Sequence, residues 1–508
     1  MTGSGKGAES NSNGTDSHAK DSHAKNEVDK PLSYAELPAQ REDWQIINRI
    51  GQPSYPEQFG FGYLTLQSGE NNLAARSGHD DKIGTRADGQ GVNKPDTRPV
   101  ENYREVTGES LLKNISYTLV DGKDVAAERN KLVNGLEKGF GDTPMERDRA
   151  KIFMGNFEER MLSMEQAYRK QGLDQEQAHK KVQEEVRETY KQVNRILDKN
   201  EPSLVGLSEK EREMLAKQIL SNACNTNDIG QGGHKTCNVA AVEVRTYAQD
   251  PAAAARLVAD VALTGKYTTR DGHEIKINKG SLTPHDEAKT DPPMSGGRNF
   301  ANQIFQVAAV NVYYQRHGDK RYEQREPSGK DGDTGERLVD YSVNPPKEGP
   351  TWFDKLTSQD FDFFYNSPNL GGPAIVDIGN QITDNKGKSW YFAQKDNAGG
   401  DVPTVSSQED LLRQLENAAN SGQLPVVLRV NTRNEPFWTD SGAGKAGGSG
   451  GWHVVTVTDF AGGSPPKIMV DNQWDRNSDH DSKSSAIDLP TLYRAMQMPE
   501  QNAVAKKT

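Results

Sequence analysis

The sequence predicts an α+β fold in which helices come first along the chain and strands follow. Between about residues 101 and 222, apolar side chains recur every three or four positions on otherwise charged segments, which is typical of amphipathic helices. After about residue 370, short β-branched and aromatic runs bounded by Gly, Pro and Asn are typical of strands. The two halves of the ordered chain are therefore expected to differ in secondary structure.

The composition narrows the class of protein. Of 508 residues, 33% are hydrophobic and 27% are charged, so the length allows about three domains while a sizeable part cannot be packed core. The net charge of -11 supplies no basic surplus to neutralise phosphates, which excludes nucleic acid as a main partner. Two cysteines, Cys224 and Cys237, are too few for a disulfide framework and fit a reducing compartment.

Residues 1–42 are rich in Gly, Ser, Asn, Asp and Lys, a composition that cannot offset the entropy of ordering. We therefore expect a disordered tail there, a mostly irregular segment at 43–100, and a flexible C-terminus at 500–508. The first residues have no apolar stretch of a signal peptide, and no later run reaches about eighteen apolar residues, so we expect no membrane span. The compartment stays open between the cytoplasm and export by a route without a signal peptide.

The region at 101–222 is expected to be a helical domain. Its central helix begins after Asp174, which can cap it, and carries a single apolar stripe. An earlier helix ends near Gly172, and Ser208 to Glu211 is typical of a capping box for a later helix that reaches Ala223. We expect these helices to pack as one antiparallel layer. The stripe consists of Ala178, Val182, Val186, Tyr190, Val193 and Leu197.

Helices are also expected in the first part of residues 223–499. They begin at Cys237, after Asp250-Pro251 and at Asn299, while a polar stretch at 317–350 is expected to be a surface excursion. Strands then dominate. They are expected at 373–378, 390–393, 426–430, 454–457 and 468–470.

A glycine-rich turn delivers Cys237 to the start of an apolar, alanine-rich helix. Backbone N–H groups at a helix N-terminus favour a nearby anion, so a thiol there loses its proton more readily and becomes a better nucleophile. Gln231 lies six residues upstream, where its amide can point at the same reacting atom as the Cys237 N–H. Two such donors form an oxyanion hole. The alternative is that Cys237 is a small buried hydrophobe.

Among the ten histidines, His453 opens a β-branched run directly after a long glycine-rich loop. An imidazole at such a strand end can act as the base for a thiol. The next predicted strand ends at Asp471 and Asn472, and Asn472 can hold the ring by accepting from its second N–H. Asp471 competes for this role, because neighbouring strand residues face opposite sides and the register is open.

These residues resemble the pattern of papain-like cysteine peptidases. In that family a Gln stands six residues before the nucleophilic Cys, a His opens a strand far downstream, and an Asn-x-Trp closes the next strand. The segment before the histidine, a helix and then a strand at 407–430, is also similar to the family. The presence of Trp474 favours Asn472 over Asp471. The matching residues, in the family order, are Gln231, Cys237, His453 and Asn472-Gln473-Trp474.

The resemblance implies a two-lobed α+β fold over residues 223–499, with helices in the left lobe, an antiparallel β-sheet in the right lobe, and a cleft between them. It implies a thiol protease that cleaves a protein or peptide substrate through Cys237, His453 and Asn472. A Cys237 thiolate and His453 imidazolium pair would act through an acyl-enzyme intermediate. Gln231 would supply the oxyanion hole, and no cofactor or metal is implied. The helical domain would be an inhibitory pro-segment or would bind a protein partner.

Two positions depart from the family pattern. His234 and Asn238 stand where secreted members usually carry a second Cys and an aromatic residue, so we place the chain in the wider superfamily. An amidase or acyltransferase with the same triad stays open, as does a non-enzymatic binding protein on the same scaffold. The glycine-rich loop at 441–451 is expected to form one mobile rim of the cleft. The alternating acidic residues at 475–481 are expected to be a solvated turn rather than a calcium site.

Overall fold

The computed structural model describes most of the chain between residues 123 and 498. Contacts divide the chain into two units, Met1–Ile47 and Asn48–Thr508, and every described residue belongs to the second. The expected tail at 1–42, the segment at 43–100 and the C-terminus at 500–508 therefore lie outside the described residues. The described ranges are 123–139, 144–289, 298–326, 335–348, 370–384, 389–395, 402–437, 451–461, 466–473 and 484–498.

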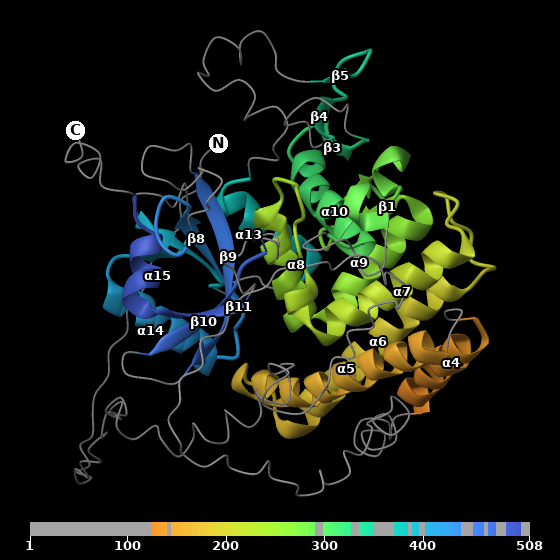
Figure 1. Cartoon of the computed structure of the whole chain (residues 1–508), viewed down its shortest axis with the longest axis horizontal. Helices are drawn as coiled ribbons and strands as arrows, with labels where there is room; N and C mark the ends of the chain where they lie inside the picture. Colours follow the sequence, from red (N-terminus) through yellow and green to blue (C-terminus); the bar gives the residue numbers. More distant parts are fainter. Residues whose placement is uncertain are drawn as a thin grey trace, which may run out of the picture. The chain divides into compact units, whose positions relative to one another are not determined.

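The fold is mixed α+β, as the sequence predicts, and helices come first (Figure 1). Helix α6 is central to the first group, because it contacts the other three helices and also α9 (Pro251–Thr264), which lies further along the chain. None of the helices in the described ranges combines the length and the apolar character needed to cross a bilayer. The first group consists of α4 (Lys123–Gly139), α5 (Pro144–Lys170), α6 (Gln175–Leu197) and α7 (Glu209–Cys224).

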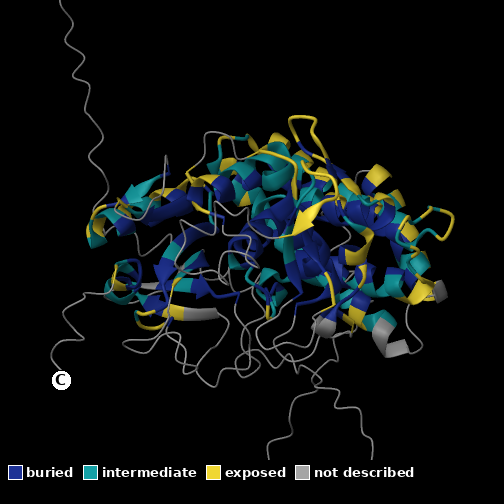
Figure 2. Ribbon diagram, turned by 90° about the horizontal axis from the view of Figure 1, so that it is seen from above, coloured by how far each residue is buried: buried dark blue, intermediate teal, exposed yellow. Residues whose placement is uncertain are grey.

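The expected cap at Asp174 and the expected capping box at Ser208 are both confirmed, and Asp174 also forms a capping box. The Asp174 side chain accepts from the backbone N–H of Gln177, whose own side chain accepts from the Asp174 N–H, and Ser208 and Glu211 make the same exchange at the start of α7. Most of the predicted apolar stripe of α6 is completely buried (Figure 2). Burial of each of its large apolar side chains contributes about 1.5–3 kcal/mol, so packing rather than helix propensity holds α6 in place.

Three further helices begin where the sequence predicts. They are α8 (Cys237–Gln249), α9 and α10 (Phe300–Arg316). The side chain of Asp250 accepts from the Ala253 N–H at the start of α9, and α10 is capped in the same way by Asn299. A short hairpin of β1 (Lys266–Thr268) and β2 (Glu274–Lys276) follows α9, and 3-10 turns span Thr226–Asp228, Lys279–Leu282 and Asp286–Lys289.

The expectation of a surface excursion at 317–350 is wrong for the described part of that stretch. A three-stranded antiparallel sheet forms there from β3 (Lys320–Gln324), β4 (Glu336–Asp340) and β5 (Lys347–Glu348). We call it the insertion sheet. Strand β3 packs on α10. Hydropathy could not reveal this sheet, because the side chains that it buries are mostly polar and are stabilised by hydrogen bonds to one another.

A six-stranded sheet has the order β11-β10-β9-β8-β6-β7. Pairing is antiparallel from β8 to β11, but β6 runs parallel to both β8 and β7, so the sheet is mixed rather than wholly antiparallel. Helix α14 (Gln408–Asn420) lies between β7 and β8 in the chain. It provides the crossover connection that parallel pairing of β6 with β8 requires. The strands are β6 (Tyr391–Gln394), β7 (Thr404–Val405), β8 (Val426–Asn431), β9 (Trp452–Ala461), β10 (Lys467–Asp471) and β11 (Ser484–Asp488), and α15 (Leu489–Ala495) follows them.

The predicted strand at 373–378 is wrong, because these residues belong to helix α13 (Gly372–Ile382). Proline stands in its first turn, a position that suits a helix. Ile375, Ile378 and Ile382 are buried at helical spacing. A short apolar run fits a strand and a buried helix equally well. The periodicity of six residues therefore could not distinguish the two.

Helix α8 lies between the helices and the six-stranded sheet, since it contacts α9, α10 and α13 as well as β8 and β9. Every residue from Asn238 to Ala248 is buried. The first residue of this buried helix is Cys237. The fold therefore carries the thiol to the meeting point of the helices and strand β9.

Candidate active site

One buried side chain of α10 holds both ends of the loop before Cys237. Gln306 donates from Nε2 to the carbonyl oxygen of Gly230 (2.9 Å), and its Oε1 accepts from the Thr236 hydroxyl (2.7 Å). Gly232 turns the chain between these two points with a φ of 60°, a conformation that favours glycine. Gln306 is fully buried, so water does not compete for these bonds. The loop therefore enters α8 along a defined path.

The Cys237 thiol lies beside strand β9. The backbone N–H groups of Val454, Asn238 and Cys237 itself favour the thiolate. Burial is the larger effect and, with a smaller contribution from the charge of Glu336, raises the pKa of the thiol to about 11. Because Val454 directly follows His453, the thiol lies next to the start of the strand that carries the imidazole.

The imidazole of His453 is held by Asn472. Its Nε2 lies 2.8 Å from Asn472 Oδ1, and both residues are buried. An amide oxygen only accepts hydrogen bonds, so Nε2 carries the proton and Nδ1 remains as the proton acceptor. Burial lowers the pKa of His453 to about 4, although the hydrogen bond to Asn472 acts in the opposite direction.

The structure brings Asn472 rather than Asp471 to the imidazole. Asp471 is completely buried, and its Oδ2 accepts from Gln473 Nε2 (3.1 Å), which also donates to the hydroxyl of Thr456 (3.1 Å). Asp471 and Asn472 are neighbours at the end of β10, where successive side chains point to opposite sides. The register of β10 against β9 therefore decides between them.

Gln231 joins the loop before Cys237 to the segment after β10. Its backbone N–H donates to the carbonyl oxygen of Gln473 (3.0 Å). Its side chain turns back into its own loop, where Nε2 donates to the carbonyl oxygen of His234 (2.8 Å). This bond uses one of the two hydrogens on Nε2. Sequence analysis predicted that Gln231 lies near Cys237, but it did not predict the hydrogen bond to the His234 carbonyl oxygen.

The protonation states differ from the sequence-based expectation of a thiolate and imidazolium pair. With pKa values of about 11 for Cys237 and about 4 for His453, both groups are neutral at pH 7 in the free protein. The helix N-terminus does favour the thiolate, as expected, but desolvation is the larger effect at this buried position. The site therefore holds a neutral thiol and a neutral imidazole rather than an ion pair.

Two residues of the site were missed by sequence reasoning. Gln306 is one of several buried amides in a largely apolar helix, and amides in such a helix are a signal of hydrogen bonds to buried polar groups. Glu336 is completely buried in β4, and both of its carboxylate oxygens accept from the backbone N–H of Lys235, at 3.3 and 3.2 Å. No local pattern indicated Glu336, because its partner lies 101 positions away.

Some expected features of the site lie outside the described residues. They are Trp474, the acidic stretch at 475–481 and the glycine-rich loop up to residue 450. The last residue of that loop, Gly451, is described, and its backbone N–H donates to the hydroxyl of Thr432 (2.8 Å). Thr432 in turn donates from its backbone N–H to the carbonyl oxygen of Gly451 (2.9 Å). This pair defines where β9 begins beside β8.

The chain matches no protein-family model, no curated protein and no solved structure.

Proposed function

We propose that the chain is a papain-like thiol hydrolase that cleaves peptide bonds in a protein or peptide substrate. The observation that carries the proposal is the 2.8 Å contact between His453 Nε2 and Asn472 Oδ1 on the strands beside Cys237. The backbone N–H of Val454, the residue after His453, favours the thiolate of Cys237. A nucleophile, a base and a group that orients the base therefore occur together, which is the arrangement that acyl transfer requires.

The reaction starts from neutral groups. As the sulfur of Cys237 attacks the carbonyl carbon, its proton passes to Nδ1 of His453, and Asn472 holds the imidazolium that forms. The imidazolium then gives this proton to the leaving amine while the C–N bond breaks, which leaves a thioester. Water attacks the thioester with His453 as base, and the acid and the free thiol are released.

The oxyanion of each tetrahedral intermediate needs donors that are already in place. The N–H of Cys237 at the start of α8 is one of them, supported by the N-terminal end of the helix. The second is the Nε2 hydrogen of Gln231 that is not used in the bond to the His234 carbonyl oxygen. Since that bond holds the amide before substrate arrives, little reorganisation is needed during the reaction.

We also infer that the described helical layer supports α8 and does not inhibit the site. Arg160 of α5 donates to the carbonyl oxygens of Tyr247 (2.7 Å) and Ala248 (3.2 Å), at the C-terminal end of α8. Cys237 is at the other end of this helix, about 16 Å away at 1.5 Å per residue. An inhibitory pro-segment has to cover the nucleophile, and these contacts lie far from it.

A second function, a binding protein on the same scaffold, is favoured by one observation. A thiol pKa of about 11 leaves little thiolate at neutral pH, which is unlike an activated nucleophile. An amidase or an acyltransferase would use the same three residues. An amidase differs from a peptidase in the amide that it hydrolyses, and an acyltransferase differs in the acceptor of the acyl group.

The test is digestion of a complex peptide library, followed by mass spectrometry, with the wild-type chain, Cys237→Ala and Cys224→Ala. We expect new cleavage products with wild type and with Cys224→Ala, and none with Cys237→Ala. Peptides that the wild-type chain binds but does not cleave would support the binding protein. Products joined to an added amine would support an acyltransferase. Cleavage by Cys237→Ala would overturn the proposed nucleophile.

A further inference from the structure

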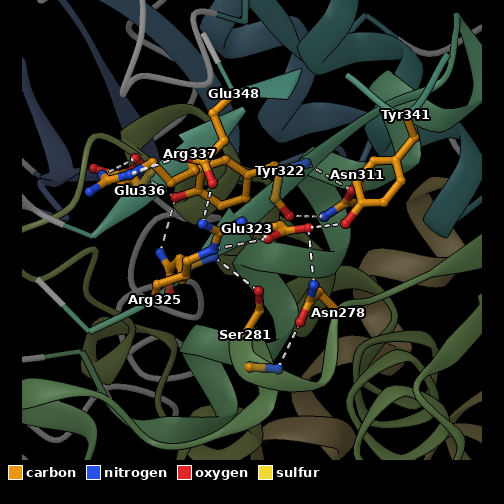
Figure 3. Close-up of polar contacts among 12 residues, drawn as sticks. Asn278, Ser281, Asn311, Tyr322, Glu323, Arg325, Glu336, Arg337, Tyr341 and Glu348 are labelled. Carbon is orange, nitrogen blue, oxygen red and sulfur yellow. Dashed lines mark hydrogen bonds and ion pairs between the residues drawn. The ribbon is translucent and has the colours of Figure 1, made fainter. Parts of the chain in front are cut away.

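The insertion sheet buries a polar cluster beside the loop that leads to Cys237 (Figure 3). On one face of the sheet, Gln324 pairs with Glu336 and Tyr322 lies two residues before Gln324, so these three side chains share that face. On the other face, Glu323 accepts from Asn278 Nδ2 (3.0 Å) and from the Tyr341 hydroxyl (2.5 Å). The two faces therefore carry separate carboxylate networks.

Glu336 connects the first network to the loop. Its carboxylate accepts from the Lys235 N–H through both oxygens, and its Oε1 also accepts from the Tyr322 hydroxyl (2.6 Å). Lys235 stands two residues before Cys237, next to Thr236, which is bonded to Gln306. Consecutive residues of the loop are thus held by two different elements, β4 and α10. A buried carboxylate is costly unless such bonds satisfy it, which argues that the position has a function beyond packing.

We propose that Glu336 is a positioning residue for the Cys237 thiol, acting through the backbone N–H of Lys235 and through its negative charge. The inference rests on the proposed function, in which Cys237 is the nucleophile. Burial is the main cause that disfavours the thiolate in the free protein, and the charge of Glu336 adds to it. The insertion sheet is therefore part of the catalytic scaffold and not a surface excursion.

Other charges face the same region from neighbouring elements. Arg298 is fully buried and donates to Gln324 Oε1 (2.8 Å), and it lowers the pKa of His234 and opposes the rise in the pKa of Tyr322. Its positive charge therefore offsets part of the charge of Glu336. Tyr391 on β6 also interacts with the thiol, and its pKa is raised to about 12, mainly by burial and in small part by Cys237. The charge of Glu336 acts on the thiol in the direction that raises its pKa.

Glu336→Gln is the test variant, because it removes the charge and keeps an oxygen that can accept from Lys235. The readout is the rate of Cys237 alkylation by iodoacetamide against pH, followed by mass spectrometry of the Cys237 peptide. We expect the rate at pH 8 to rise about tenfold, with the profile shifted down by about one pH unit and the plateau at high pH unchanged. Glu323→Gln is the matched control, and we expect its profile to coincide with that of wild type.

Tyr322→Phe is a second variant, which keeps the carboxylate and removes its shortest donor. Without the Tyr322 hydroxyl, the negative charge of Glu336 is less compensated and should disfavour the Cys237 thiolate more strongly. The alkylation rate at pH 8 should therefore fall below that of wild type. Opposite shifts in the two variants support the proposal. An unchanged profile in either folded variant, or an equal shift in Glu323→Gln, would overturn it. Alkylation reports on the thiol whether or not the chain cleaves peptides, so failure of the proposed function is seen separately in the library digestion.

Discussion

The backbone N–H of Gln231 donates to the carbonyl oxygen of Gln473 at 3.0 Å, which joins the loop before the nucleophile to the residue after Asn472. These two segments lie more than two hundred positions apart in the chain. Because His453 contacts Asn472, the bond links the oxyanion loop to the group that orients the base. The geometry of the site is therefore coupled across the helices and the sheet, and several substitutions should report on that coupling.

Replacement of Asn472 should impair turnover more than binding. Asn472→Ala removes the acceptor of the Nε2 proton, so His453 loses its fixed orientation and tautomer. We expect kcat to fall about 10²-fold with little change in KM. Steady-state kinetics on the best library peptide measure this. Asp471→Asn is the neighbouring control, and a loss of kcat as large as that of Asn472→Ala would contradict the assignment.

Gln306 should affect both stability and turnover. Gln306→Ala leaves the carbonyl oxygen of Gly230 and the hydroxyl of Thr236 without their buried partner, so we expect the free energy of unfolding to fall by about 2–3 kcal/mol. The loop also loses its anchor, and kcat should fall about tenfold or more. Chemical denaturation and steady-state kinetics give the two values.

Gln303 provides the control for this prediction. It is equally buried on α10 but donates to the carbonyl oxygens of Ser281 and Thr283 and not to the nucleophile loop. Gln303→Ala should lose similar stability and retain kcat. If both variants lost kcat to the same degree, the effect would be general loosening of α10 and the anchor role would be wrong.

Acid should destabilise the protein through His453. Its pKa in the folded state is about 4, below the ordinary value of 6.5, so the unfolded chain binds the proton more tightly. The contribution of His453 to the stability of the folded state is fully present above pH 6.5. It is lost as the pH falls from 6.5 toward 4. Between pH 7 and pH 5, wild type should lose about 2 kcal/mol more unfolding free energy than His453→Gln. Urea denaturation at the two pH values checks this, and parallel losses would show that His453 is not the group responsible.

The helical layer should be required for activity. Arg160→Ala removes the donor to the last carbonyl oxygens of α8, so we expect the free energy of unfolding to fall by about 1–3 kcal/mol and turnover to fall with it. Arg169→Ala, an exposed position on the same helix, should leave both unchanged. Proteolytic release of residues 123–224 should abolish turnover. A rise in activity after that release would instead identify an inhibitory segment.

The sequence by itself determined the features that depend on near neighbours. Three helix starts are predicted by their capping residues, because a capping side chain bonds to backbone groups within the next three residues. These residues are Asp174, Ser208 and Asp250. The positions of Cys237 at a helix start and His453 near a strand start follow from the same kind of local signal. Mixed α+β content and the starts of these helices were predictable for this reason.

The tertiary structure decided what depends on distant partners. Gln306 and Glu336 meet the nucleophile loop from 70 and 101 positions away, and no spacing in the sequence encodes such bonds. The choice of Asn472 over Asp471 came from the register of β10, which pairing with its neighbours sets. Burial likewise turned an expected ion pair into two neutral groups. Desolvation depends on the atoms that surround a side chain, and most of those atoms belong to residues that are remote along the chain.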